Sequence, residues 1–266
     1  MTNKYEDYIE IVEKIDENKM KNGFCVQKWK NGKKFTGIFL NNKIKGWAKL
    51  NNLEMEICGE FSDDFLNGYG EVINYVENKL YEGYWIQGVL GGVGSEKGEN
   101  YIYLGNFITN QKEGYGKQIW DDMDMYEGEW KDNDFNGYGI YYYHNGKQYT
   151  GEWEKSCKSG FGELSYPEGK KYVGYFKNDS KNGFGIYYIK KGNLTINFWK
   201  DGKRHGLGKY FNNNTIYYQL WEDNELIKTN MNESLFMDSF DDDIKKYRNM
   251  FELNIDEIIK FLDVNE

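Results

Sequence analysis

A pair of small residues, nine positions apart, recurs eight times along this chain of 266 residues. Glycine fills both positions in seven of the pairs, and Asn197 replaces the first glycine of the eighth. Successive pairs begin 22 to 24 residues apart, at Gly37/Gly46, Gly59/Gly68, Gly83/Gly92, Gly105/Gly114, Gly128/Gly137, Gly151/Gly160, Gly174/Gly183 and Asn197/Gly206. A fixed period of this length is typical of stacked repeats, so the chain is predicted to form a repeat array, an architecture that usually offers a surface for partners.

Each repeat predicts an antiparallel β-hairpin. Tyr126, Gly128 and Trp130 alternate with Glu127 and Glu129, so the first three would share one face of a strand. An Asn-Gly pair after the second strand of this repeat is a strong turn signal. Glycines recur at fixed positions of the repeat, next to positions that recur as Trp, Tyr or Phe. This pattern predicts that aromatic rings pack over the bare backbone of a neighbouring hairpin. Because a lone hairpin is barely stable, consecutive hairpins are expected to stack.

The spacing Tyr-x-Gly-x-Trp, with Gly-x-Gly beginning nine residues after the first glycine, resembles the MORN repeat. The resemblance covers about residues 35–211, and it is weaker in the first, third and eighth repeats. Together with the hairpin pattern, it implies an all-β repeat array, an elongated and twisted single-layer antiparallel sheet of stacked β-hairpins. Proteins of this family commonly act at the cytoskeleton or under membranes. The resemblance therefore implies a scaffold or adaptor in a cytoskeletal, ciliary or membrane-associated assembly.

The chain is predicted to have three segments. Residues 1–21 are expected to form an amphipathic capping helix, because Tyr5, Tyr8, Val12 and Ile15 recur at helical spacing. Residues 22–228 form the repeat array of about eight full units, and residues 229–266 form an acidic helical segment. This segment caps the last hairpin or, as the alternative, lies in a groove of the sheet or joins a second copy in a homodimer. Its apolar helical face comprises Phe236, Phe240, Ile244, Tyr247 and Phe251.

Charge is distributed unevenly along the chain. The net charge is −9, residues 222–266 carry −8 of it, and residues 168–209 carry +7. The basic stretch suggests an alternative function, peripheral binding to anionic phospholipid or to an acidic partner, and the acidic tail could compete for the same stretch. Its candidate residues are Lys170, Lys171, Lys177, Lys181, Lys190, Lys191, Lys200, Lys203 and Arg204.

The aromatic columns of the repeats are the candidate contacts for protein partners, because aromatic side chains favour interface hot spots. Most of these rings must also form the thin core, so only some of them are expected to reach a partner, which could be a helical segment. On one face the candidates are Trp130, Trp153, Phe176 and Trp199, and on the other they are Tyr138, Phe161, Phe184 and Leu207.

Catalytic, cofactor and metal sites are not predicted. The two histidines, His144 and His205, lie in different repeats and have no nearby nucleophile in the sequence. The glycine-rich run 88–95 lacks the lysine of a phosphate-binding loop, and the aspartate runs near 121–124 and 241–243 read as solvated turns. The net negative charge argues against nucleic acid as a partner. Three scattered cysteines and the lack of a signal-like or membrane-spanning stretch favour the cytoplasm or the inner face of a membrane.

Overall fold

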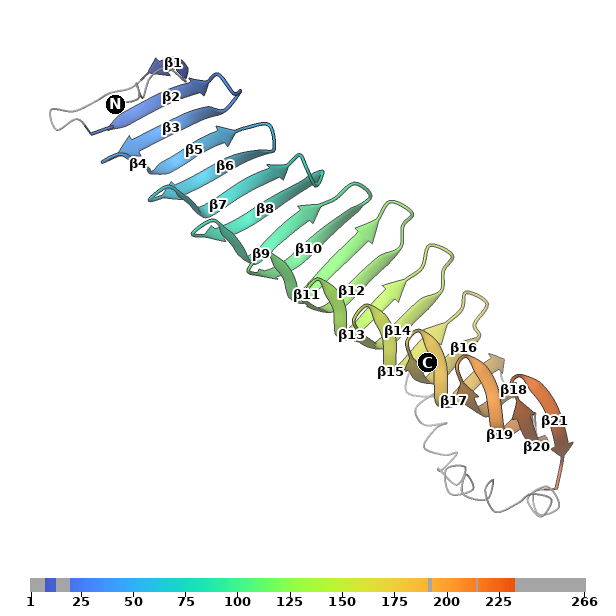
Figure 1. Ribbon diagram of the computed structural model, residues 1–266. Coiled ribbons are helices and arrows are strands. Elements are labelled where there is room, and N and C mark those ends of the chain that lie inside the picture. The colour runs from blue at the N-terminus through green and yellow to red at the C-terminus, as the bar shows by residue number, and fades with distance from the viewer. Residues whose placement is uncertain (1–7, 13–19, 191–192, 214, 233–266) are drawn as a thin grey trace. The chain divides into compact units, whose positions relative to one another are not determined.

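The computed structural model describes residues 8–12, 20–190, 193–213 and 215–232, and every regular element in these ranges is a β-strand (Figure 1). The chain divides into two compact units, Met1–His144 and Asn145–Glu266. Among the described residues, no helix is long and apolar enough to cross a membrane.

The first unit is an antiparallel sheet in which strands pair in chain order, with β3 pairing to β2, β4 and β5. Its strands are β1 (Tyr8–Val12), β2 (Gly23–Trp29), β3 (Lys34–Leu40), β4 (Lys43–Ile44), β5 (Gly46–Asn51), β6 (Met55–Ser62), β7 (Phe65–Asn74), β8 (Lys79–Ile86), β9 (Val89–Lys97), β10 (Tyr101–Ile108), β11 (Gln111–Trp120), β12 (Met125–Lys131) and β13 (Asp134–Tyr142).

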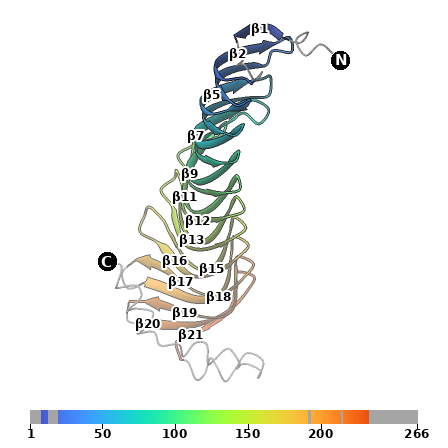
Figure 2. The ribbon, with the colours of Figure 1, turned by 90° about the vertical axis from the view of Figure 1, so that its left-hand side faces the viewer.

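The second unit is also an antiparallel sheet with strands in chain order (Figure 2). Its strands are β14 (Gln148–Glu154), β15 (Cys157–Ser165), β16 (Lys171–Lys177), β17 (Ser180–Lys190), β18 (Asn193–Lys200), β19 (Lys203–Asn212), β20 (Thr215–Glu222) and β21 (Glu225–Asn230). In both units, therefore, the predicted antiparallel hairpins are confirmed.

Each sheet has two different faces. We call the face that carries Tyr126, Gly128 and Trp130, and their equivalents in other repeats, the inner face, and the opposite one the outer face. Tyr126 is completely buried on the inner face, and Gly128 lies directly opposite Gly139. A Cβ atom on Gly139 would lie 2.4 Å from the Tyr126 hydroxyl oxygen, and one on Gly128 would lie 2.5 Å from the Gly139 Cα. Only glycine leaves room for the ring here.

The tyrosine ring covers the glycines of its own hairpin, and the expected cover of a neighbouring hairpin comes from the tryptophan. Its hydroxyl donates to the Glu129 carbonyl oxygen at 2.8 Å, which closes the ring over β12 itself. The tryptophan makes the contact with the preceding hairpin. Trp130 Nε1 donates to the Gly116 carbonyl oxygen at 3.1 Å, and its ring meets that of Tyr103 edge-on at 4.9 Å.

A β-bulge recurs in the hairpins and explains the glutamate between the glycine and the tryptophan. The register between β12 and β13 shifts between Gly128 and Trp130, and Gly137 adopts a φ of 79° opposite the shift. The Glu129 carboxylate accepts a hydrogen bond from the Tyr138 backbone N–H at 3.0 Å. Because the bulge leaves this N–H without a ladder partner, the carboxylate takes the place of a backbone carbonyl.

The predicted N-terminal helix is wrong over residues 8–12. These residues form β1, which pairs antiparallel with β2 from Tyr8↔Trp29 to Val12↔Val26. The segment Tyr-Ile-Glu-Ile-Val is rich in residues that favour strands, and pairing satisfies the exposed edge of β2. The rest of the predicted helix falls in residues 1–7 and 13–19, outside the described ranges. The predicted acidic C-terminal helical segment, residues 229–266, falls mainly in residues 233–266, which are also outside them, and its first two residues, Thr229 and Asn230, belong to strand β21 (Glu225–Asn230) instead.

Candidate partner-binding site

The outer face of the first unit carries a column of exposed apolar side chains. Its members are the middle residues of successive Gly-x-Gly segments, and we call them the outer-face column: Tyr69, Val93, Tyr115 and Tyr138. Their exposed fractions are 40%, 69%, 57% and 56% in that order. They lie on β7, β9, β11 and β13, so successive members are about 9.6 Å apart along the sheet.

Other apolar and acidic groups adjoin this column. Tyr84 on β8 is paired with Tyr69, is 60% exposed and meets its ring edge-on at 5.5 Å. The Tyr69 hydroxyl donates to the Glu82 carboxylate, and the Tyr115 hydroxyl donates to Glu127 Oε1 at 2.9 Å. These hydrogen bonds raise the pKa of both tyrosines, because each is made to a carboxylate that disfavours ionisation of the phenol. The surface is therefore aromatic and lined with negative charge.

The structure divides the eight predicted partner-binding residues between core and surface. On the inner face, Trp130, Trp153 and Phe176 are buried and Trp199 is half-buried, so these rings mainly hold the sheet together. On the outer face, Phe161 and Phe184 are half-buried, Leu207 is only 4% exposed, and Tyr138 is 56% exposed. Among the eight, Tyr138 thus offers the most accessible ring.

Sequence reasoning missed Tyr69, Tyr84, Val93 and Tyr115. For three of them the signal was already present, since Tyr69, Val93 and Tyr115 occupy the same repeat position as Tyr138. Extending that position back through the less regular repeats would have found the outer-face column. Tyr84 follows the first glycine of its repeat, where the next regular repeats carry polar residues such as Asn106 and Glu129, so its repeat position alone did not mark it.

The predicted basic residues do not form one surface. Lys177, Lys200 and Lys203 flank the short turns after β16 and β18, whereas Lys170, Lys171 and Lys190 lie at the opposite strand ends. Lys181 and Arg204 belong to the inner face, and Lys191 is outside the described ranges. These residues therefore do not form a single basic plane that could lie on a phospholipid surface. Phospholipid binding stays a prediction.

Cations occupy four positions of one column on the inner face. The position opposite the tryptophan of each hairpin, or opposite the phenylalanine that replaces it, holds Leu66, Leu90, Lys112 and Phe135 in the first unit, and Lys158, Lys181, Arg204 and Leu226 in the second. Lys181 Nζ lies 4.5, 5.0 and 4.6 Å from the ring centroids of Tyr172, Tyr187 and Trp199. Burial, assisted by the positive charge of Arg204, lowers the pKa of Lys181 to about 8.

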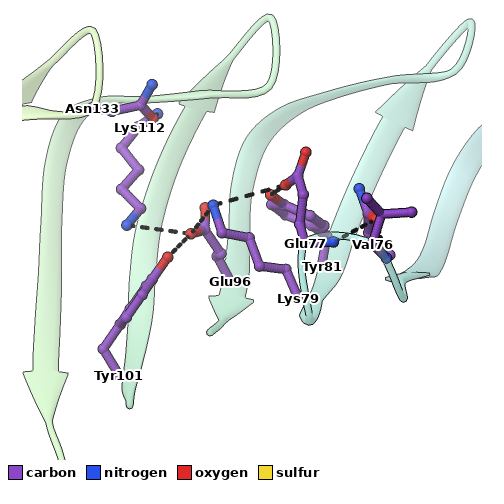
Figure 3. A network of polar contacts seen from close by, with 9 residues as sticks. Val76, Glu77, Lys79, Tyr81, Glu96, Tyr101, Lys112 and Asn133 are labelled. Carbon is purple, nitrogen blue, oxygen red and sulfur yellow. Dashed lines mark hydrogen bonds and ion pairs between the residues drawn. The ribbon is translucent and has the colours of Figure 1, made fainter. Parts of the chain in front are cut away.

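Lys112 occupies the same position but belongs to a buried ionic network (Figure 3). Its Nζ donates to Gln118 Oε1 at 2.8 Å and lies 3.6 Å from Glu96 Oε1. Glu96, with a side chain 5% exposed, also accepts from the Tyr101 hydroxyl and lies 3.3 Å from Lys79 Nζ. Burial lowers the pKa of Lys112 to about 8, although the Glu96 charge acts in the opposite direction. Every charge in this network has a partner, so a structural role explains it.

The histidines form no nucleophile–base pair with the residues described. His144 Nδ1 lies 2.9 Å from Asp124 Oδ1, and Asp122 completes a group whose ligand atoms all lie within 4.8 Å of one another. Asp124 already accepts from the Tyr141 hydroxyl at 2.7 Å and the His144 N–H at 2.8 Å, which ties the turn together. His205 Nδ1 lies 3.6 Å from Asp223, in the second unit.

Eight segments of the chain match the family model for the MORN repeat: residues 17–34, 58–72, 81–101, 103–124, 126–148, 149–171, 172–194 and 198–216. Together they cover more than half of the chain. The chain belongs to the MORN-repeat family. MORN repeats are in general non-enzymatic and are typical of repeat scaffolds.

No curated protein sequence matches the chain. Among solved structures, the TCP domain of SAS-4 (dCPAP) from Drosophila melanogaster, in complex with a proline-rich motif of Ana2, is 12% identical with a TM-score of 0.28 over 71% of this chain and 90% of that one. A mutant TCP10 domain of CPAP from Danio rerio is 8% identical with a TM-score of 0.26, over 71% and 93%. Scores this low carry no argument about what the chain binds.

Proposed function

We propose that this MORN-repeat protein is a non-catalytic scaffold that binds a protein partner through the outer face of its first unit. The observation that carries the proposal is the outer-face column, in which exposed side chains recur every two strands. Large exposed apolar patches on a folded protein mark interaction sites, and tyrosine is among the residues that contribute most to binding energy.

The second unit offers less exposed apolar surface on its outer face. At the equivalent positions there, Phe161 and Phe184 are half-buried and Leu207 is 4% exposed, whereas the column in the first unit exposes 40% to 69%, and Tyr175, at 50%, is the main exposed ring beside them. The first unit therefore offers the larger accessible apolar surface for a partner.

The chemistry of the surface constrains the partner. Glu82 and Glu127 lie beside the exposed tyrosines, and Glu129 lies in the adjacent bulge. A partner segment that presents apolar side chains to the rings and basic side chains to these carboxylates would be complementary in both respects. A cytoskeletal, ciliary or membrane-associated setting, predicted from the family resemblance, stays a prediction.

A photocrosslinking experiment tests the site. The photoreactive residue p-benzoylphenylalanine replaces Tyr115 in one variant and Val76 in another, because Val76 is 76% exposed but lies in the turn after β7, away from the column. A protein crosslinked from position 115 and not from position 76 is then purified. Its affinity is measured for the wild-type chain, for the double variant Tyr84→Ser/Tyr115→Ser and for Val76→Ser.

Truncating two interface tyrosines is expected to weaken binding at least tenfold, while Val76→Ser stays within twofold. The proposal fails if the double variant binds within twofold of wild type. It also fails if both crosslinking positions capture the same proteins equally, because that would show non-specific contact.

A further inference from the structure

The inner face of the second unit contains one interruption of the tyrosine column. In the preceding repeat, Tyr172 is fully buried, and its hydroxyl oxygen would lie 2.3 Å from a Cβ atom on Gly185. Its ring forms one wall around Lys181 Nζ, at 4.5 Å, and meets the Trp199 ring edge-on at 5.6 Å. A regular repeat therefore places a tyrosine ring between its glycines and its cation.

The eighth repeat lacks this ring. Thr195 stands where the tyrosine would be, and Asn197 stands where the first glycine would be. The Asn197 side chain lies over Gly208, since a Cβ atom there would be 2.2 Å from Asn197 Nδ2. The amide thus fills the space that a tyrosine hydroxyl occupies in the preceding repeat, but nothing in β18 replaces the aromatic ring.

The missing ring leaves a cavity. It has a volume of about 480 Å³ and is lined mainly by Tyr187, Ile189, Thr195, Trp199, Arg204 and Asn224. Pockets that bind ligands usually have volumes between about 300 and 1,000 Å³, so this one is large enough for a side chain and its neighbour. All five lining residues on β17, β18 and β19 belong to the inner face.

Two cations adjoin the cavity without a counter-charge among the described residues. Arg204 Cζ lies 3.8 Å from the centroid of the Trp221 ring, and Arg204 lines the cavity together with Thr195, the position of the missing tyrosine. Lys181 Nζ lies 5.0 and 4.6 Å from the ring centroids of Tyr187 and Trp199, which line the cavity, and Trp199 pairs with Arg204 across β18 and β19.

Buried hydrogen-bonding groups at the same place have no partner. Trp199 Nε1 is buried and donates to nothing, whereas Trp85 and Trp130 donate to the carbonyl oxygens of Gly70 and Gly116. Asn197 is 1% exposed, and neither of its amide atoms has a partner. It stands between Thr195 and Trp199 on the same face of β18. Unsatisfied buried polar groups are uncommon, and here one belongs to Trp199, which lines the cavity, and the others belong to Asn197, two residues from the lining residues Thr195 and Trp199.

We propose that this cavity is a second binding site, which accepts a carboxylate of an acidic protein segment together with an adjacent aromatic side chain. The carboxylate would accept hydrogen bonds from Arg204 and Trp199 Nε1 and would neutralise the charge shared with Lys181. The aromatic side chain would occupy the space that a tyrosine fills in the preceding repeat and would contact Tyr187 and Ile189. This site lies in the second unit and does not depend on the outer-face column.

A labelled peptide tests the proposal. The probe is a fluorescein-labelled peptide of sequence Gly-Glu-Glu-Tyr-Glu-Glu-Gly, its uncharged control has Gln for Glu, and binding is followed by fluorescence anisotropy with the full-length chain. Because the chain's own Asp238, Asp241, Asp242 and Asp243 could compete, a variant with all four changed to Asn is measured in parallel.

Three substitutions locate the binding site. The double variant Thr195→Tyr/Asn197→Gly restores the pattern of Tyr172 and Gly174, so it should fold while filling the cavity. Arg204→Gln removes one cation, and Lys171→Gln is the matched control, since it removes a charge of the same unit that lies outside the cavity. The first two variants are expected to weaken binding of the acidic peptide at least tenfold, and the control to stay within twofold.

Tighter binding by the tail variant than by wild type would support the site and identify the tail as a competing occupant. The proposal is overturned if neither the wild-type chain nor the tail variant binds the acidic peptide better than its Gln control. It is also overturned if Lys171→Gln weakens binding as much as Arg204→Gln, because attraction would then be diffuse. The double variant Tyr84→Ser/Tyr115→Ser should bind the acidic peptide as the wild type does. That result would show that the cavity binds independently of the outer-face column, so the two proposals can fail separately.

Discussion

Lys112 and Lys181 occupy the same position of two repeats, and replacing each by leucine is expected to change the free energy of unfolding in opposite directions. Leucine is native at this position in Leu66 and Leu90, so it fits the inner face. The two lysines differ in their counter-charges. Lys112 lies 3.6 Å from the buried Glu96, whereas Lys181 has aromatic rings around it and the positive charge of Arg204 nearby.

The magnitude for Lys181 follows from its pKa. A fall from 10.5 to about 8 corresponds to about 3 kcal/mol at about 1.4 kcal/mol per pH unit, and we halve this because the side chain is only half-buried. Cation–π contact with three rings, at roughly 0.5 kcal/mol each, offsets about 1.5 kcal/mol, which is nearly all of the remainder. Leucine removes both contributions and adds apolar burial, so Lys181→Leu should stabilise the protein by about 1 kcal/mol.

For Lys112→Leu, the loss of the counter-charge dominates. Removing one partner of a buried ion pair costs about 3–5 kcal/mol, and the lower limit applies because Lys79 and the Tyr101 hydroxyl remain on Glu96. With the gain from leucine subtracted, Lys112→Leu should destabilise the protein by about 2 kcal/mol. The two variants should therefore differ by about 3 kcal/mol.

Urea unfolding followed by tryptophan fluorescence, at pH 7 and at pH 9.5, measures both effects. Since Lys181 regains a pKa near 10.5 on unfolding, this residue binds more protons in the unfolded than in the folded chain between pH 8 and 10.5. The contribution of Lys181 to the free energy of unfolding therefore rises with pH in this window, so the change in that free energy from pH 7 to pH 9.5 should be more favourable in the wild type than in Lys181→Leu. If both substitutions shift stability in the same direction at pH 7, the assignment of charge pairing to this column is wrong.

Two further predictions concern the hairpin itself. Gly128→Ala should lower the free energy of unfolding, measured in urea, by about 3 kcal/mol, because its Cβ atom would lie 2.5 Å from backbone. Gly92→Ala is the control and should lower it by only about 1 kcal/mol, because Gly92 has a φ of 73° but nothing lies within 4 Å of its Cβ position. Equal losses in the two variants would exclude the packing explanation. Glu129→Ala should cost about 1 kcal/mol by the same assay, because the Tyr138 N–H loses its acceptor. Its control Glu127→Ala should stay within about 0.5 kcal/mol, and a reversed order would contradict the role assigned to the bulge.

Much of the fold follows from the sequence because one spacing recurs. The distance from Gly128 to Gly137 sets where the strand turns and bulges, and the alternation of Tyr126, Gly128 and Trp130 assigns them to one face. The N-terminal error has a different origin. Residues 8–12 lie outside the repeat, and a short segment with apolar residues at spacings of three and four can also read as a strand, so pairing with β2 decided the outcome.

The sites were harder to predict because they depend on comparison between repeats. The exposed ring of Tyr138 was found in a regular repeat, but its equivalent Val93 lies in an irregular one. The replacement of glycine by Asn197 was visible in the sequence. The cavity beside it could not be predicted, because this needs the strand register that pairs Asn197 with Gly208 and Thr195 with Tyr187. The inner-face position of Lys181 likewise depends on pairing across the turn, which linear charge counts do not show.

The glycine pairs on adjoining strands within each unit also affect how such a protein can evolve. Gly116 pairs with Gly128, and Gly162 with Gly174, so the link between one hairpin and the next has the same register in both units. A duplication or deletion of about 23 residues would therefore preserve strand pairing on either side. It would lengthen or shorten the outer-face column by one side chain, in steps of about 9.6 Å. Genes of this type can thus change the length of this exposed apolar surface without redesigning any contact between hairpins.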